Sequence, residues 1–114
     1  MELTGSAGRV LGMEPPFKLG GVGETKPANP EVQGYCDTVK SKFLEQSGLN
    51  VTEFKADSYR DQVVAGMYYY IKVWLGGDKY CHIKVYNPLP HTGGKPELQG
   101  YKLDKSKEES IGFF

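Results

Sequence analysis

The chain has 114 residues, and its 14 Lys and Arg residues balance its 14 Asp and Glu residues, so the formal net charge is zero. This length fits one domain with a single core. A neutral chain lacks the positive field that attracts nucleic acids or anionic membranes, and no segment approaches the roughly 18 apolar residues of a membrane-spanning helix. The N-terminus also lacks the apolar core of a secretory signal. We therefore expect a cytoplasmic protein with neither a nucleic acid nor a membrane as partner.

The first 18 residues differ in composition from the rest of the chain. They hold glycine, serine, proline and scattered apolar residues without any regular period. Such a segment cannot bury enough apolar surface to fold, which predicts a flexible N-terminal arm over residues 1–18. The folded domain then covers residues 19–114, with a short first strand expected around Val22 to Lys26.

A strong helix-start signal follows the arm. Asn29 can cap a helix N-terminus, Pro30 suits the first helical position, and Glu31 complements the positive end of the helix dipole. Apolar residues then recur at helical spacing on one face: Val32, Cys36, Val39 and Phe43. Gly48 is suited to ending the helix in the left-handed conformation. The pattern predicts one amphipathic helix of about four to five turns.

A short apolar link joins the next two strand-like segments, Phe54–Asp61 and Met67–Leu75. The intervening residues 62–66 read Gln-Val-Val-Ala-Gly and are expected to form a hairpin tip. Tips ordinarily use Asn, Asp or Gly, which suit the turn backbone and tolerate water. Valines exposed at a tip gain nothing in the free protein, so they indicate a surface that a partner buries. The alternative is that both valines belong to a strand and that the turn lies elsewhere.

From residue 51 onward the apolar period is two, as in strands with one buried face. A turn is expected at Gly76-Gly77-Asp78, a long loop at Asn87–Pro96, and a closing strand at Leu98–Leu103. The core-facing positions of the two central strands are Tyr69, Ile71, Val73, Leu75, Cys81, Ile83 and Val85. The opposite face carries Tyr, Trp and Lys and is expected to meet water, with His82 on it.

These elements predict an α+β fold in which the single helix covers one face of an antiparallel sheet. Consecutive antiparallel strands place alternate loops at the same end of the sheet. The link at residues 62–66 and the loop around Leu89 should therefore lie side by side. The N-terminal trunk at Leu19-Gly20 joins the same edge if the first strand pairs antiparallel with the second.

The cysteines and histidines do not predict a metal or cofactor site. Cys36 and Cys81 are too few for a disulfide framework and have no metal-ligand spacing. Two buried, reduced thiols are expected in a cytoplasmic protein, with a bond between them as the alternative. His82 and His91 have no third ligand in sight, so no metal and no cofactor is expected. Asn50 begins a glycosylation sequon, which is used only in the secretory pathway.

Several motifs occur in the order typical of one family. The segment Gln-Val-Val-Ala-Gly resembles the signature loop of the cystatin family of cysteine-protease inhibitors, and its flanks resemble the stefin branch. The flanking motifs are Gly20-Gly21, Lys26-Pro27-Ala28, Tyr69–Val73, Lys79–Val85, Leu89-Pro90-His91, Gly100-Tyr101 and Phe113-Phe114. The resemblance runs from about Gly20 to Phe114. The arm and Lys18, which stands where an apolar residue is expected, depart from the pattern.

This resemblance implies both a fold and a function. The fold is an antiparallel β-sheet wrapped around one long α-helix. The function is reversible, tight-binding inhibition of papain-like, cathepsin-class cysteine proteases by a wedge that occludes the active-site cleft. The resemblance assigns protease binding to Leu19, Gly20, Gly21, Gln62, Val63, Val64, Ala65, Gly66, Leu89, Pro90 and His91.

Other classes of function have less support in the sequence. The sequence shows neither a Ser/His/Asp spacing nor a phosphate-binding glycine loop, so nothing in it indicates an enzyme. A cystatin-fold interaction module without protease inhibition is the alternative, favoured by the arm and by Lys18 and disfavoured by the intact signature at residues 62–66. A monomer is expected, with exchange of halves between two copies through an opened hairpin as the alternative.

Overall fold

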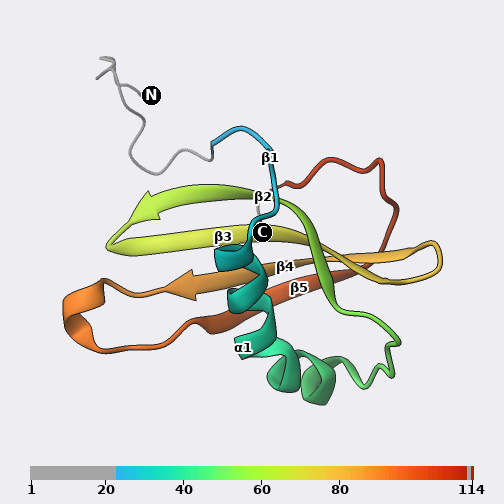
Figure 1. Ribbon diagram of the computed structural model, residues 1–114, viewed down its shortest axis with the longest axis horizontal. Helices are drawn as coiled ribbons and strands as arrows, with labels where there is room; N and C mark the ends of the chain where they lie inside the picture. Colours follow the sequence, from blue (N-terminus) through green and yellow to red (C-terminus); the bar gives the residue numbers. More distant parts are fainter. Residues whose placement is uncertain (1–22, 113) are drawn as a thin grey trace.

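The computed structural model describes residues 23–112 and residue 114. This part of the chain forms a five-stranded antiparallel sheet, in the order β1-β2-β3-β4-β5, with one helix across one face (Figure 1). The elements are β1 (Lys26–Pro27), α1 (Pro30–Ser47), β2 (Lys55–Val64), β3 (Gly66–Gly76), β4 (Lys79–Asn87), the 3-10 helix η1 (Pro90–Thr92) and β5 (Glu97–Lys105). The predicted α+β class is confirmed. The expected first strand is shorter and later, at Lys26–Pro27.

Local sequence signals set both ends of α1. The Asn29 side chain accepts a hydrogen bond from the Val32 N–H at 2.8 Å, and Pro30 occupies the first turn. At the other end Gly48 adopts a left-handed φ of 73°, and its N–H donates to the Leu44 carbonyl at 3.0 Å. Both ends are therefore capped as the sequence predicted, which satisfies backbone groups that the helix itself leaves unpaired.

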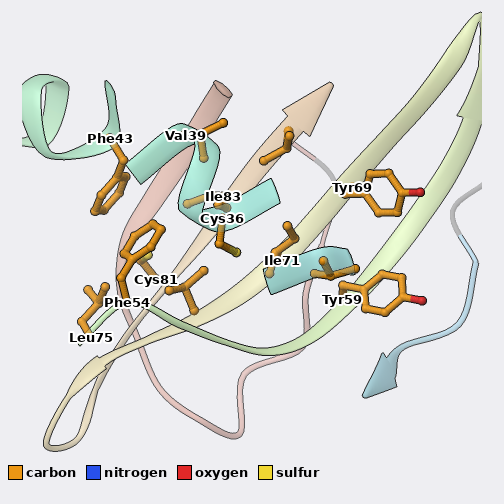
Figure 2. Close-up of a cluster of buried hydrophobic side chains, with 13 residues drawn as sticks. Cys36, Val39, Phe43, Phe54, Tyr59, Tyr69, Ile71, Leu75, Cys81 and Ile83 are labelled. Carbon is orange, nitrogen blue, oxygen red and sulfur yellow. The ribbon is translucent and has the colours of Figure 1, made fainter. Parts of the chain in front are cut away.

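The hydrophobic core lies between α1 and the sheet (Figure 2). The predicted helix stripe of Val32, Cys36, Val39 and Phe43 is buried. Opposite it, the sheet contributes five side chains with no exposed surface: Ile71, Val73, Cys81, Ile83 and Val85. Phe43 adds aromatic contacts to Phe54 and Tyr101, with ring centroids 5.3 and 5.2 Å apart. Burial of each large apolar side chain stabilises the fold by about 1.5–3 kcal/mol.

Both cysteines are free thiols within this core. Burial raises the pKa of Cys36 and of Cys81 to about 12, and the Asp37 carboxylate adds to the effect at Cys36. A thiol with so high a pKa holds almost no nucleophilic thiolate at neutral pH. The cysteines therefore act as small apolar side chains of the core. This agrees with the sequence, which predicted two buried, reduced thiols.

The opposite face of the sheet does not meet water along its whole length, contrary to the prediction from strand alternation. Tyr70, Lys72 and His82 are only 3%, 7% and 1% exposed. The chain that follows β5, residues 106–112 and 114 (the C-terminal segment), turns back toward the middle of the sheet (red in Figure 1), and Ile111 within it is 1% exposed. Alternation distinguished the two faces of each strand but gave no sign of what covers them.

Basic side chains of the sheet hold the backbone of the C-terminal segment. The Lys72 ammonium donates to the carbonyl of residue 107. The Lys84 ammonium donates to the carbonyl of residue 114 at 2.9 Å, and an Arg60 guanidinium nitrogen donates to the carbonyl of residue 111 at 2.7 Å. Hydrogen bonds from charged donors are stronger than neutral ones, so three such bonds fix this segment along the sheet.

His82 is buried on this covered face, and its Nε2 has no hydrogen-bond partner among the described residues. Burial, together with the positive charges of Lys72 and Lys105, lowers the pKa of His82 from 6.5 to about 4, with Glu109 opposing the shift. The folded protein therefore keeps this imidazole neutral over a pH range in which the unfolded chain protonates it.

Acid should consequently destabilise the fold through His82. Between pH 6.5 and about 4 only the unfolded chain takes up this proton, so the free energy of unfolding falls as the pH falls. The loss is complete below that range, absent above it, and amounts to about 3 kcal/mol at most. We expect His82→Gln to flatten this part of the profile in urea unfolding followed across the same range. Parallel profiles for the two proteins would contradict the assignment.

Candidate functional site

The signature residues 62–66 lie where β2 turns into β3, at the left end of the sheet in Figure 1. β2 continues through Val64 and β3 begins at Gly66, so only Ala65 lies between the two strands. Val63 pairs with Met67, and Val64 pairs with Gly66. The prediction that all five residues form a hairpin tip is therefore wrong in extent. Both valines belong to a strand, although the chain does reverse beside them.

The two valines differ in exposure. Val63 is 52% exposed, whereas Val64 is partly buried. Neighbouring residues of a strand point to opposite faces, so the two side chains face different surroundings. Among the described residues, the large hydrophobic side chains that stand exposed are those of Val63 and Leu89. The apolar surface is therefore carried chiefly by Val63 at this turn.

The loop between β4 and β5 lies beside this turn, as the strand order predicted. Asn87, the last residue of β4, pairs with Met67 at the start of β3. Within the loop, the Leu89 carbonyl accepts hydrogen bonds from the Thr92 N–H at 3.0 Å and from the Thr92 hydroxyl at 2.7 Å. Leu89, Pro90 and His91 are all exposed. Two apolar points from different hairpins thus share one end of the sheet.

Both the backbone conformation and the close neighbours at position 66 require glycine. Its φ of +111° lies in a region that L side chains rarely adopt. A Cβ at this position would lie 2.7 Å from the Asn87 carbonyl oxygen and 3.0 Å from the Tyr86 hydroxyl oxygen. The glycine of the signature therefore lets the turn approach β4 closely.

We expect Gly66→Ala to destabilise the protein by about 2–4 kcal/mol, because strain at the backbone adds to the collision with β4. Gly77→Ala is a matched control, since Gly77 also has a positive φ, 58°, but nothing lies within 4 Å of its added Cβ. The control should lose only about 1 kcal/mol. Urea unfolding measures both variants, and equal losses would show that the approach to β4 does not matter.

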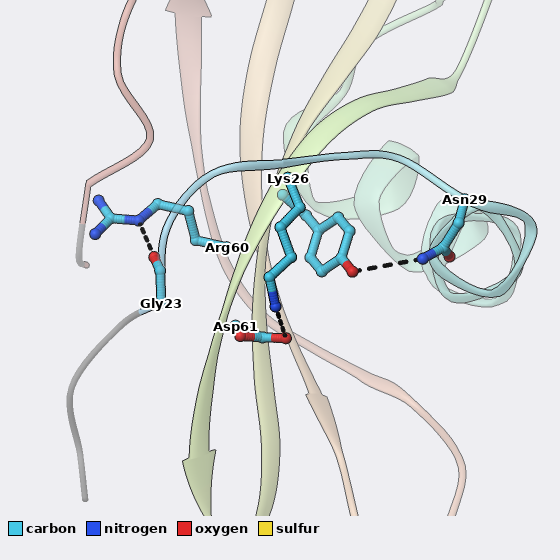
Figure 3. Close-up of polar contacts among 6 residues, drawn as sticks. Gly23, Lys26, Asn29, Arg60 and Asp61 are labelled. Carbon is cyan, nitrogen blue, oxygen red and sulfur yellow. Dashed lines mark hydrogen bonds and ion pairs between the residues drawn. The ribbon is translucent and has the colours of Figure 1, made fainter. Parts of the chain in front are cut away.

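The N-terminal end of the described chain runs along β2 from the same end of the sheet (Figure 3). β1 pairs antiparallel with β2, and the Gly23 N–H donates to the Asp61 carbonyl at 2.8 Å. The Arg60 Nε donates to the Gly23 carbonyl at 2.7 Å, and the Lys26 ammonium lies 3.4 Å from the Asp61 carboxylate. The Asp61 charge raises the pKa of Lys26. The expected binding residues Leu19, Gly20 and Gly21 lie outside the described residues.

Arg60 is a residue that sequence reasoning missed. Its Nε holds the carbonyl of Gly23, and another nitrogen of the same guanidinium holds the carbonyl of Ile111, both at 2.7 Å. Arg60 therefore joins the N-terminal lead-in to the C-terminal segment. An arginine at an outward position of a strand looks like an ordinary solvated residue, so the sequence carried no signal for this role.

The large hydrophobic side chains exposed at this end of the sheet, Val63 and Leu89, offer apolar contact surface. Within residues 23–112 and 114, no group of three or more His, Cys, Asp or Glu side chains could hold a metal ion. The same part of the chain has no helix with the length and apolar composition of a membrane span. The two thiols are buried away from this end, with raised pKa values. The arrangement is suited to docking against another surface.

Comparison with known proteins decides the family. The model of the cystatin domain matches residues 20–108. The chain belongs to the cystatin family. This cystatin is 45% identical over 95 residues to cystatin-A1 of Sus scrofa, covering 83% of this chain and 92% of the relative. It is 38% identical over 96 residues to stefin-C of Bos taurus, covering 84% and 95%. The predicted resemblance to the stefin branch is thereby confirmed.

One relative carries a functional name. This cystatin is 43% identical over 95 residues to a Sus scrofa protein named leukocyte cysteine proteinase inhibitor 1, covering 83% of this chain and 92% of the relative. That name describes an inhibitor and not an enzyme. The matched region of the family model begins at residue 20, so residues 1–18 lie outside it.

Proposed function

We propose that this protein is a reversible, tight-binding inhibitor of papain-like cysteine proteases, whose active-site cleft it occludes. The observation that carries the proposal is that two exposed apolar side chains, Val63 and Leu89, lie on neighbouring hairpins at one end of the sheet. Exposed apolar surface concentrated at one place favours a site for a partner. A relative named as a cysteine proteinase inhibitor supports the class of partner.

The proposed wedge consists of three parts: the trunk at residues 19–21, the β2–β3 turn at residues 62–66, and the β4–β5 loop at residues 89–91. A papain-like protease has a long cleft with apolar walls and a catalytic thiolate on its floor. Val63 would be buried against one wall, with Leu89 and Pro90 further along it. Gly20 would lie beside the thiolate, where the missing Cβ avoids a collision. No peptide bond is presented for attack, so binding would be reversible.

The structure of the free protein favours tight binding by such a wedge. The turn is a single residue between two paired strands, and the loop is closed by hydrogen bonds to Leu89. Ordered segments lose little conformational entropy when they dock, so more of the contact free energy remains as affinity. The proposed contacts are Leu19, Gly20, Gly21, Gln62, Val63, Val64, Ala65, Gly66, Leu89, Pro90 and His91.

Further parts of the proposal concern the setting of this activity. The partners would be cathepsin-type proteases, and the inhibitor would act as a monomer with a folded domain at residues 19–114 and an arm at residues 1–18. A cytoplasmic location is supported by the two free, buried thiols, which are usual in reducing compartments. An interaction module without inhibition is disfavoured by the intact signature and by the inhibitor name of a relative.

Titration of papain tests the proposal directly. Active papain at a fixed concentration should lose activity in proportion to the added protein until the two are equimolar. Dilution of the complex to below its dissociation constant should restore activity, because no covalent bond forms. Full papain activity in the presence of excess protein would refute the proposal and favour the interaction module.

Val63→Asp should weaken papain inhibition without loss of stability. The side chain is 52% exposed in the free protein, so a carboxylate is tolerated there. In the complex the same carboxylate would be buried without a partner, which costs about 2 kcal/mol or more and raises the inhibition constant at least about thirtyfold. Ser41→Asp, which adds the same charge at an exposed position of α1, serves as control. An unchanged inhibition constant for Val63→Asp would remove Val63 from the binding surface.

A further inference from the structure

The β2–β3 turn is held by a side chain from a strand that does not belong to the hairpin. The Tyr86 hydroxyl donates a hydrogen bond to the carbonyl of Ala65, the single residue between β2 and β3. Tyr86 is on β4, which pairs with β3 on the side away from β2. Its side chain therefore reaches across the end of β3 to the turn.

Tyr86 itself is firmly placed in the sheet. β4 has a neighbour on each side, and Tyr86 pairs with Tyr68 of β3 and with Glu97 of β5. The rings of Tyr86 and Tyr68 lie 5.4 Å apart between centroids. The next residue, Asn87, donates from its side chain to the Tyr35 hydroxyl of α1 at 3.3 Å. A strand that is hydrogen-bonded on both sides moves less than a turn at the end of a sheet. Tyr86 can therefore support the β2–β3 turn.

The turn also has a shape that fits Tyr86. A Cβ on Gly66 would lie 3.0 Å from the Tyr86 hydroxyl oxygen and 3.1 Å from a carbon of its ring. Such distances leave no room for any side chain at position 66. The phenol therefore occupies the space that this glycine leaves, and its hydroxyl reaches the carbonyl of the preceding residue.

We propose that Tyr86 is a positioning residue for protease binding, which acts through the β2–β3 turn. Its hydrogen bond fixes the Ala65 carbonyl and with it the direction in which Val63 is presented. Because Tyr86 also lies at the base of the β4–β5 loop, it ties together the two hairpins of the wedge. The proposal rests on the proposed function. Loss of this support would leave the turn to be ordered during docking, which weakens binding mainly through faster dissociation.

Tyr86→Phe tests the role because it removes only the hydroxyl and keeps the ring against Gly66. Hydrogen exchange of the amides at residues 63–67 is measured in the free protein, and dissociation from papain is measured separately. We expect faster exchange at these amides and about fivefold faster dissociation, the effect of one lost hydrogen bond. Tyr68→Phe is the matched control, since its ring is the neighbour of Tyr86 and its hydroxyl makes no hydrogen bond within the described residues. The control should change neither quantity.

The two measurements separate the alternatives. Faster dissociation with unchanged exchange would mean that the hydroxyl contacts the protease directly, which overturns a positioning role. Faster exchange with unchanged dissociation would show that binding does not need the support, and no change in either would deny the support itself. If the unaltered protein fails to inhibit papain, the proposed function fails, whereas exchange at residues 63–67 still decides whether Tyr86 holds the turn.

Discussion

The candidate site depends on one constraint: each strand pairs antiparallel with the strand that precedes it in the chain. In a sheet of this order, every second connection returns to the same end. The β2–β3 turn and the β4–β5 loop are separated by two strands and so come together. The turn at Gly77, between β3 and β4, lies at the opposite end of the sheet, away from the exposed Val63 and Leu89. No contact between the two hairpins is needed to bring them to one edge.

The rigidity of this edge comes from burial on both faces of the sheet. The capped helix α1 covers one face with a stripe of four buried side chains, and the C-terminal segment covers part of the other face. The central strands β3 and β4 are thus enclosed, and the turn and loop extend from their ends. The turn and the loop need no hydrophobic core of their own, because the enclosed strands hold their bases. Exposed apolar side chains can then remain at the edge without loosening the domain.

Much of this structure could be predicted because its signals are local. The caps at Asn29 and Gly48 and the two periods of apolar residues define the helix, the strands and the core without knowledge of distant contacts. Two features depended on distant contacts: the sequence left open whether the two valines belong to a strand, and it gave no sign that His82 is buried. Strand pairing continued through the valines because Gly66 permits a turn of one residue against β4. The burial of His82 followed from a tail without any apolar period, and residues 19–21 of the proposed wedge remain a prediction.

The C-terminal segment is held in an unusual way for a tail. Arg60, Lys72 and Lys84 all donate to its main-chain carbonyls and not to its side chains. Every residue has a carbonyl, so most positions of the tail can change in identity while these three bonds persist. Their spacing along the backbone, however, is fixed by the strands beneath. Apart from the buried Ile111, this tail is therefore restricted more in length than in composition, since one inserted or deleted residue would displace the acceptors from their donors.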